Sequence, residues 1–136
     1  MREKARDKGR LEDIIEYSHN VMKLIEGIPF NEFQKDIRTY YAVMKNVEIV
    51  GEAAYMLTPA FKETHPMTPW SVVQGMRHVL VHGYASIKPD TLYETATTGI
   101  PELCEQIEKY LANTDWEQWE KEAHPDFSVA GPHRPA

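Results

Sequence analysis

Apolar residues recur at steps of three and four along most of this chain, and almost no segment alternates apolar and polar residues as a half-buried strand would. This spacing gathers the apolar side chains on one face of a helix. It is clear in residues 11–25, 31–58, 69–82 and 90–111. The sequence therefore predicts an all-α fold, an up-and-down bundle of four to five helices.

Prolines and capping residues set the expected ends of the second and third helices. Asn31 is a good N-cap, and the helix after it is expected to continue unbroken to just before Pro59. Residues 59–69 form a connection with several prolines. Thr68 followed by Pro69 is typical of an N-cap and a first helical residue, so the third helix is expected to run from there to about residue 82.

The fourth helix is expected to begin at Asp90 and to be kinked or split by Gly99 and Pro101. We expect residues 1–113 to form one helical bundle. Residues 114–136 are expected to add a short acidic helix, whose Trp116 and Trp119 cover an end of the bundle, and a proline-containing tail that is disordered.

Length and composition limit the class of protein. A chain of 136 residues is long enough for one domain with its own core. The single cysteine, Cys104, excludes an intramolecular disulfide and a zinc cluster built on cysteines. No apolar run is long enough to span a membrane, and the charged N-terminus lacks the apolar stretch of a secretory signal, so we expect a cytoplasmic protein.

The charge is negative overall and unevenly distributed. A net charge of −6 argues against coating nucleic acid by bulk electrostatics, although it leaves room for a local basic site. Residues 1–10 carry five basic and two acidic groups, whereas residues 102–126 carry eight acids and two lysines. A nucleic-acid surface should therefore lie away from the C-terminal part.

Most of the chemically reactive side chains gather within residues 74–84. Arg77 and His78 are adjacent, and His82 and Tyr84 follow within two turns. On an ideal helix His78 and His82 share a face, whereas Arg77 and His82 lie roughly 140° apart. Arg77 and His82 therefore converge only if the helix end unwinds or if a second copy of the segment faces the first.

This set of residues suits cleavage of an RNA phosphodiester without a metal. Histidine can take the proton of the 2′-hydroxyl or return one to the 5′-oxygen near neutral pH. Arginine offers paired donors to phosphate and keeps its charge. Because the 2′-hydroxyl is the nucleophile, such an enzyme would be specific for RNA by its mechanism.

Several other interpretations compete from residue types alone. Cations near a helix end can simply complement the helix dipole. His78 and His82 have the spacing of a zinc pair, which His65 could join. The small residues Gly51, Ala53 and Ala54 favour close helix packing over a ligand site, and the tyrosines Tyr40, Tyr41 and Tyr55 favour packing over base stacking.

The segment around Arg77 also resembles a known family. Arg77, the four residues after it and His82-Gly-Tyr84 resemble the Arg-x4-His-x-Tyr motif of HepT-like HEPN toxins, the ribonuclease half of bacterial toxin–antitoxin pairs. The segment NVEIVGEAA at residues 46–54 is similar to a helix of that family. Pro69-Trp70, Gly75-Met76, Leu92 and Ile100-Pro101 fall where such proteins have similar residues. The resemblance covers residues 8–112, with histidine at position 78 where these toxins often carry asparagine.

The resemblance implies a HEPN bundle that dimerises, with two motifs facing one cleft. Arg77 and His82 would be the catalytic pair of a metal-independent endoribonuclease with no cofactor, and His78 would support them. Tyr84 would accept AMP from a cognate MntA-like minimal nucleotidyltransferase antitoxin, which neutralises the toxin. The alternative is a non-catalytic helical dimer that binds a nucleotide or docks a nucleotidyltransferase partner.

Overall fold

The computed structural model describes residues 3–78 and 88–122, and these residues form helices and connecting turns without strands. The elements follow in the order η1 (Lys4–Arg6), α1 (Asp7–Ile25), α2 (Phe30–Phe33), α3 (Ile37–Tyr55), α4 (Pro59–Glu63), α5 (Trp70–Gly75), α7 (Pro89–Glu94), the π-helical η3 (Thr95–Gly99), α8 (Ile100–Asn113) and α9 (Trp116–Lys121). The predicted all-α class is confirmed. None of the described helices is long and apolar enough to cross a membrane.

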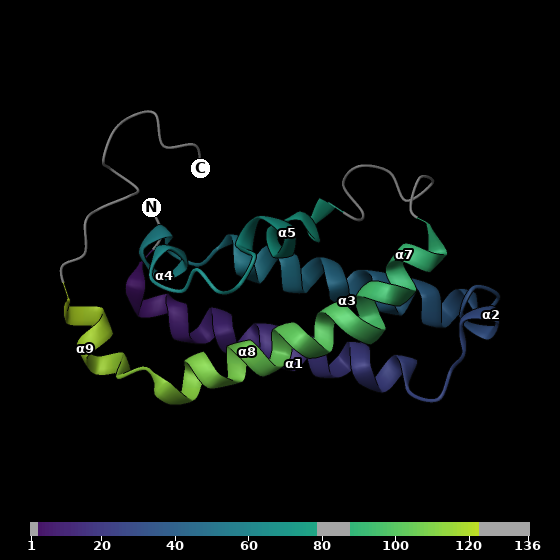
Figure 1. Cartoon of the computed structure of the whole chain (residues 1–136), viewed down its shortest axis with the longest axis horizontal. Coiled ribbons are helices and arrows are strands. Elements are labelled where there is room, and N and C mark those ends of the chain that lie inside the picture. Colours follow the sequence, from purple (N-terminus) through teal and green to yellow (C-terminus); the bar gives the residue numbers. More distant parts are fainter. Residues whose placement is uncertain (1–2, 79–87, 123–136) are drawn as a thin grey trace.

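Three long rods make up the bundle (Figure 1). Helix α1 runs along the molecule, α3 returns beside it, and α7, η3 and α8 together form the third rod. α1 packs against both α3 and α8, and α5 packs against α3. The chain thus runs up and down the bundle. Because α5 packs on α3, the turn after α5 also lies against α3.

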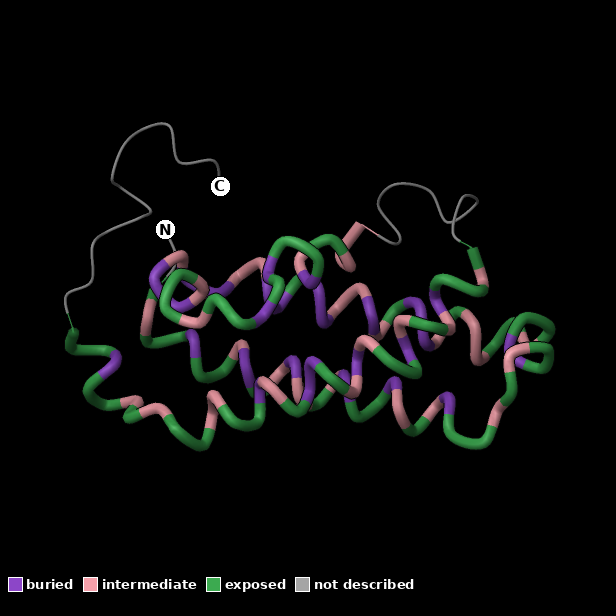
Figure 2. The backbone as a smooth tube through the Cα atoms, in the orientation of Figure 1, coloured by how far each residue is buried: buried purple, intermediate pink, exposed green. Residues whose placement is uncertain are grey.

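The apolar stripes of the sequence become the core. Figure 2 shows the buried positions of the rods turned toward one another and the exposed ones turned outward. The largest fully buried side chains of the rods are Leu11, Ile14, Val21, Val43, Met44, Val47, Val50, Ile100 and Ile107. Burying side chains of this size contributes roughly 1.5–3 kcal/mol each, so the three rods are held mainly by this contact.

The second predicted helix is not continuous. Asn31 lies inside the short α2, and the chain turns before α3 begins at Ile37. Asp36 is the N-cap of α3, because its carboxylate accepts hydrogen bonds from the backbone N–H and the hydroxyl of Thr39 at 3.2 and 2.7 Å. These hydrogen bonds lower the pKa of Asp36. The expectation of one helix from Asn31 was wrong, because Asp36 accepts these two hydrogen bonds and starts a new helix.

The connection at residues 59–69 and the fourth helix also differ from prediction. Thr58 caps a short helix, α4, within the predicted connection. The Thr68 hydroxyl bonds to Gln106 and Tyr110 and caps no helix, so that prediction was wrong. The fourth helix begins at Pro89, one residue before Asp90. It is interrupted by the π-helical η3 just before Pro101, as its glycine and proline predicted.

Aromatic side chains close the end of the bundle where α4 and α9 lie (Figure 1). Phe61 of α4 is fully buried at their centre. The rings around it belong to His65, Trp70, Tyr110, Trp116 and Trp119. The two C-terminal tryptophans therefore cover a bundle end, as the sequence indicated.

A buried carboxylate ties three distant segments together at this end. Asp7, 1% exposed at the start of α1, accepts hydrogen bonds from the Thr58 backbone N–H at 2.9 Å, the Thr58 hydroxyl at 2.7 Å and the Trp119 indole at 3.0 Å. Burial is the largest influence on its pKa and raises it, although these hydrogen bonds oppose the shift. The beginning of α1, the start of α4 and helix α9 are thus held by one side chain.

We predict that Asp7→Ala lowers the free energy of unfolding by about 1–3 kcal/mol, because it leaves buried donors of Thr58 and Trp119 without an acceptor. Chemical denaturation followed by circular dichroism measures the change. The exposed Glu12 on the same helix supplies the control, since Glu12→Ala should change stability by less than about 0.5 kcal/mol. Equal stability of the two variants would contradict the role given to Asp7.

The raised pKa also has a pH signature. Between the ordinary carboxyl pKa and the higher pKa of Asp7, the folded chain binds more protons than the unfolded chain. This group therefore makes the free energy of unfolding decrease as pH rises through that interval, and its contribution is constant above it. The difference in stability between wild type and Asp7→Ala should accordingly shrink across the acid range as pH rises.

Candidate active site

A turn after α5 carries Arg77. Helix α5 ends at Gly75, and the N–H groups of Met76 and Arg77 donate to carbonyls three residues back, at 3.1 and 3.2 Å. His78 is helical again. The helix predicted over residues 69–82 is therefore interrupted at Met76 and Arg77, and residues 79–82 of that prediction lie outside the described residues.

Gly51 of α3 explains why the turn can lie where it does. A Cβ built on Gly51 would overlap the backbone nitrogen of Arg77 and lie 2.8 Å from the Met76 carbonyl carbon. Real Cβ atoms essentially never approach so closely. The predicted close packing at this small-residue patch is confirmed, and its partner is the backbone that carries Arg77.

Tyr55 receives the Arg77 side chain. It lies one helical turn after Gly51, so both residues face the turn after α5. The central guanidinium carbon of Arg77 lies 3.8 Å from the centre of the Tyr55 ring. A cation over an aromatic face at this distance is stabilised by about 0.5–2 kcal/mol, which fixes the plane of the guanidinium.

Stacking on Tyr55 uses none of the hydrogen-bond donors of Arg77. Guanidinium N–H groups point outward in the plane, whereas the ring contacts only a face. In the part of the chain that the structure describes, Arg77 Nε is buried without a hydrogen-bond partner, and no carboxylate forms an ion pair with Arg77. Because no described carboxylate neutralises this guanidinium, an external anion can pair with it.

A second cation lies beside the same tyrosine. Lys62 Nζ is 5.9 Å from the centre of the Tyr55 ring, and it donates to Gln74 Oε1 at 2.6 Å and to the Tyr55 carbonyl at 3.3 Å. Tyr55 thus stands near both Lys62 and Arg77. Two cationic side chains thus lie near one ring in a chain whose net charge is −6.

Of the other predicted site residues, His78 and His65 lie in the described part of the chain. His78 is half-buried next to Arg77. His82 and Tyr84 lie outside the described residues. His65, the third candidate zinc ligand, stacks on Phe61 with ring centres 3.9 Å apart, and its Nδ1 is 2.8 Å from the Phe61 carbonyl. His65 therefore packs as part of the aromatic cluster around Phe61.

An apolar groove lies beside this site. Its volume is about 230 Å³, and α5 and α8 form its walls. The lining residues are Pro69, Val72, Val73, Met76, Gly99, Glu102, Leu103 and Gln106. Val72 is 64% exposed, so the helix that leads to Arg77 presents an apolar surface.

A match to a protein family shows which proteins this chain is related to. The family model described as Ribonuclease HepT-like matches residues 14–110. The chain belongs to this HEPN family. The matched range contains both halves of the candidate site, the α3 face with Gly51 and Tyr55 and the segment from Arg77 to Tyr84.

Individual relatives of this HepT-like chain agree. One from Caldanaerobacter subterraneus, named as an RNase, is 35% identical over 101 residues, which are 74% of this chain and 90% of the relative. One from Thermococcus cleftensis, named as a ribonuclease HepT, is 35% identical over 106 residues, 78% of this chain and 96% of the relative. One from Methanocaldococcus jannaschii, also named as an RNase, is 32% identical over 101 residues, 74% and 93% of the two chains. No solved structure matches this chain.

The sequence did not indicate two residues of this site, Tyr55 and Lys62. Tyr55 was grouped with the packing tyrosines, and Lys62 fell in a predicted connection. A signal for Tyr55 existed in its spacing, because it lies four residues after the small Gly51 and so shares its face. No pattern in the sequence indicates that the partner of this face is Arg77.

Proposed function

We propose that this HepT-like protein is a metal-independent endoribonuclease in which Arg77 and His82 carry out catalysis. The observation that supports this most directly is the Arg77 guanidinium, which is held on Tyr55 while its Nε lacks a partner among the described residues. An RNA phosphate fits such a group in charge and in shape. Lys62 nearby adds to the positive potential.

The proposed reaction is attack of the RNA 2′-hydroxyl on the neighbouring phosphorus. A histidine takes the hydroxyl proton, the bond from the 2′-oxygen to phosphorus forms, and the bond to the 5′-oxygen breaks. A second histidine protonates the departing 5′-oxygen, which gives a 2′,3′-cyclic phosphate and a free 5′-hydroxyl. Arg77 stabilises the negative charge that builds up on the phosphate oxygens.

We place His82 in a proton-transfer role, with His78 as a supporting residue, in a site shared by two copies of the chain. A straight helix would direct Arg77 and His82 apart, which favours a site where the arginine and the histidine come from different copies of the chain. The exposed Val72 and the groove beside Met76 offer an apolar surface on the element that leads to Arg77. A homodimer formed there would bring two copies of the motif together.

Cleavage of RNA in the presence of EDTA tests the proposed activity. Purified protein dialysed against the chelator should still cut RNA, since the cation at the phosphate is Arg77 and the proton carriers are side chains. The products should end in cyclic phosphates. His82→Ala supplies the control for contaminating nuclease and should be inactive. Activity restored only by added Mg²⁺ would overturn the mechanism, and folded protein that binds RNA without cutting it would favour the non-catalytic alternative.

We further propose that the chain is the toxin of a toxin–antitoxin pair and that its antitoxin, a minimal nucleotidyltransferase, transfers AMP to Tyr84. The neighbours of Tyr84 are the small residues Gly83, Ala85 and Ser86, which leave room for a modifying enzyme. An AMP group two residues after His82 would add bulk and negative charge close to the proposed phosphate site. Both effects oppose RNA binding.

Tyr84→Phe is predicted to remain a ribonuclease and to escape the antitoxin. No proton-transfer step of the proposed reaction uses the phenol, whereas AMP transfer needs its oxygen as acceptor. Intact-mass analysis after co-expression with the cognate nucleotidyltransferase should show AMP-sized increments on wild type and none on Tyr84→Phe. A Phe variant that is still modified would place the acceptor elsewhere, and one that is unmodified and inactive would make Tyr84 part of catalysis.

A further inference from the structure

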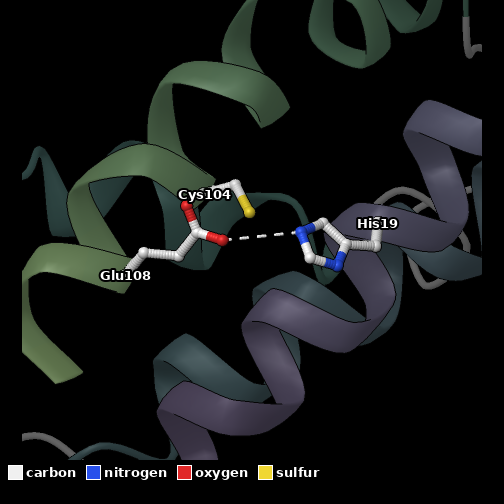
Figure 3. Close-up of side chains that lie close together, drawn as sticks. All are labelled: His19, Cys104 and Glu108. Atoms are coloured by element: carbon white, nitrogen blue, oxygen red, sulfur yellow. Dashed lines mark ion pairs between the residues drawn. The ribbon is translucent and has the colours of Figure 1, made fainter. Parts of the chain in front are cut away.

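Three potential metal ligands converge between α1 and α8, on residues that the proposed function does not use. The ligand atoms of His19, Cys104 and Glu108 all lie within 4.8 Å of one another. Figure 3 shows the histidine nitrogen, the carboxylate and the sulfur directed toward a common space. His19 Nε2 and Glu108 Oε2 are 3.6 Å apart.

The fold builds this cluster from distant parts of the sequence. Cys104 and Glu108 lie one helical turn apart on α8 and so share a face. α1 packs along that face and contributes His19. Because both helices are long and packed into the core, the three ligands are carried by rigid backbone.

We propose that His19 Nε2, Cys104 Sγ and a Glu108 carboxylate oxygen bind a zinc ion, with water as the fourth ligand. One nitrogen, one sulfur and one oxygen donor suit zinc, which accepts all three at about 2.0–2.3 Å in a tetrahedral arrangement. Mg²⁺ and Ca²⁺ prefer oxygen alone, so this donor set disfavours both. The spacing of 3.6 Å between nitrogen and oxygen is close to what two ligands of one zinc ion require.

A surface ion pair and a packed cysteine are the simpler explanations of the same residues. The His19 and Glu108 side chains are 57% and 52% exposed, and an exposed pair of this kind contributes about 0–1 kcal/mol. That pair leaves unexplained why the only thiol of the chain lies beside both side chains. The sequence excluded a zinc cluster of several cysteines, whereas this site needs one cysteine and two other ligand types.

Metal binding must displace one proton. Burial, with a smaller contribution from the Glu108 charge, raises the pKa of the Cys104 thiol to about 11, so the thiol is protonated in the metal-free chain near neutral pH. Zinc replaces that proton and takes the thiolate as a ligand, and the proton passes to solvent. The bound ion then joins α1 to α8 across 85 residues of chain.

Cobalt substitution tests the site with a signal that only sulfur ligation produces. Purified chain should bind one equivalent of Co²⁺ with a thiolate-to-cobalt charge-transfer absorption, and one equivalent of Zn²⁺ should displace it. Since the chain has a single cysteine, this band reports Cys104 whatever other histidines bind metal. Zn²⁺ should also raise the melting temperature of wild type.

Variants separate this site from adventitious binding. Cys104→Ser should abolish the band, and the surface variants His19→Gln and Glu108→Gln should weaken Co²⁺ binding at least about tenfold while remaining folded. Glu105→Gln, the same change at an exposed residue of α8, should bind as wild type does. Absence of the band in wild type, or an unchanged band in His19→Gln and Glu108→Gln, would overturn the proposal. None of these outcomes depends on whether the chain cuts RNA.

Discussion

Replacing Arg77 by alanine is expected to lower the rate of RNA cleavage by about 10²–10³-fold, the usual cost of removing one group that stabilises charge in the transition state. Among the described residues, Arg77 is the cation that lies closest to the Tyr55 ring, and this contact holds its guanidinium in place. Single-turnover cleavage of a short RNA measures the loss. A circular dichroism melt on the same sample shows whether the variant is folded.

The reason for the loss can be separated into charge and geometry. Arg77→Lys keeps the charge but offers a point-like ammonium in place of the planar fork, so its activity should fall between wild type and Arg77→Ala. Tyr55→Phe retains an aromatic face and should stay near wild type. Tyr55→Leu removes the face, so we expect kcat to decrease more than KM changes. Equal activity of Tyr55→Leu and wild type would contradict the positioning role of Tyr55.

Mixed dimers test whether two copies share the site. Arg77→Ala and His82→Ala should each be inactive alone. If one protomer supplies arginine and the other histidine, dimers of the two variants, co-expressed with different tags and purified through both, contain one intact pair. Such dimers should regain up to about half of wild-type activity if the two arginine–histidine pairs act independently. No recovery in a folded mixed dimer would mean that each protomer needs its own Arg77 and His82.

The fold was predictable because the residues that form it act locally. Apolar residues at helical spacing identify the faces that become the core, as in Leu11 and Ile14 of α1 or Val43 and Val47 of α3. The break at Asp36 was missed because Asn31 and Asp36 are both plausible caps within six residues. Choosing between them requires knowing that Thr39 donates twice to Asp36.

The site was predictable only in part, since its residues meet through tertiary packing. The sequence proposed Arg77 as a site residue by the chemistry of its segment, and it indicated close packing at Gly51. It could not indicate that Gly51 contacts the backbone of Arg77 or that Tyr55 stacks on its side chain. The cluster of His19, Cys104 and Glu108 was hidden for the same reason, because the cysteine lies 85 residues from the histidine.

Gly51→Ala should damage the enzyme far more than its size suggests. In an isolated helix this change is favourable by about 0.5–1 kcal/mol. Here the new methyl group would overlap the Arg77 backbone nitrogen and crowd Met76, and backbone atoms cannot turn aside as a flexible side chain can. Either α3 or the Met76–Arg77 turn must shift. We expect a net destabilisation of about 1–3 kcal/mol.

The effect on cleavage should exceed the effect on stability. A displacement on the order of 1 Å at a catalytic group can lower the rate about 10²-fold, and the crowded turn carries Arg77, the proposed catalytic arginine. Gly9 of α1 provides the matched control, because a Cβ there meets nothing within 4 Å. Gly9→Ala should therefore be slightly more stable than wild type and fully active. If Gly51→Ala behaves like Gly9→Ala in both melting and RNA cleavage, α3 does not hold the Arg77 turn in place.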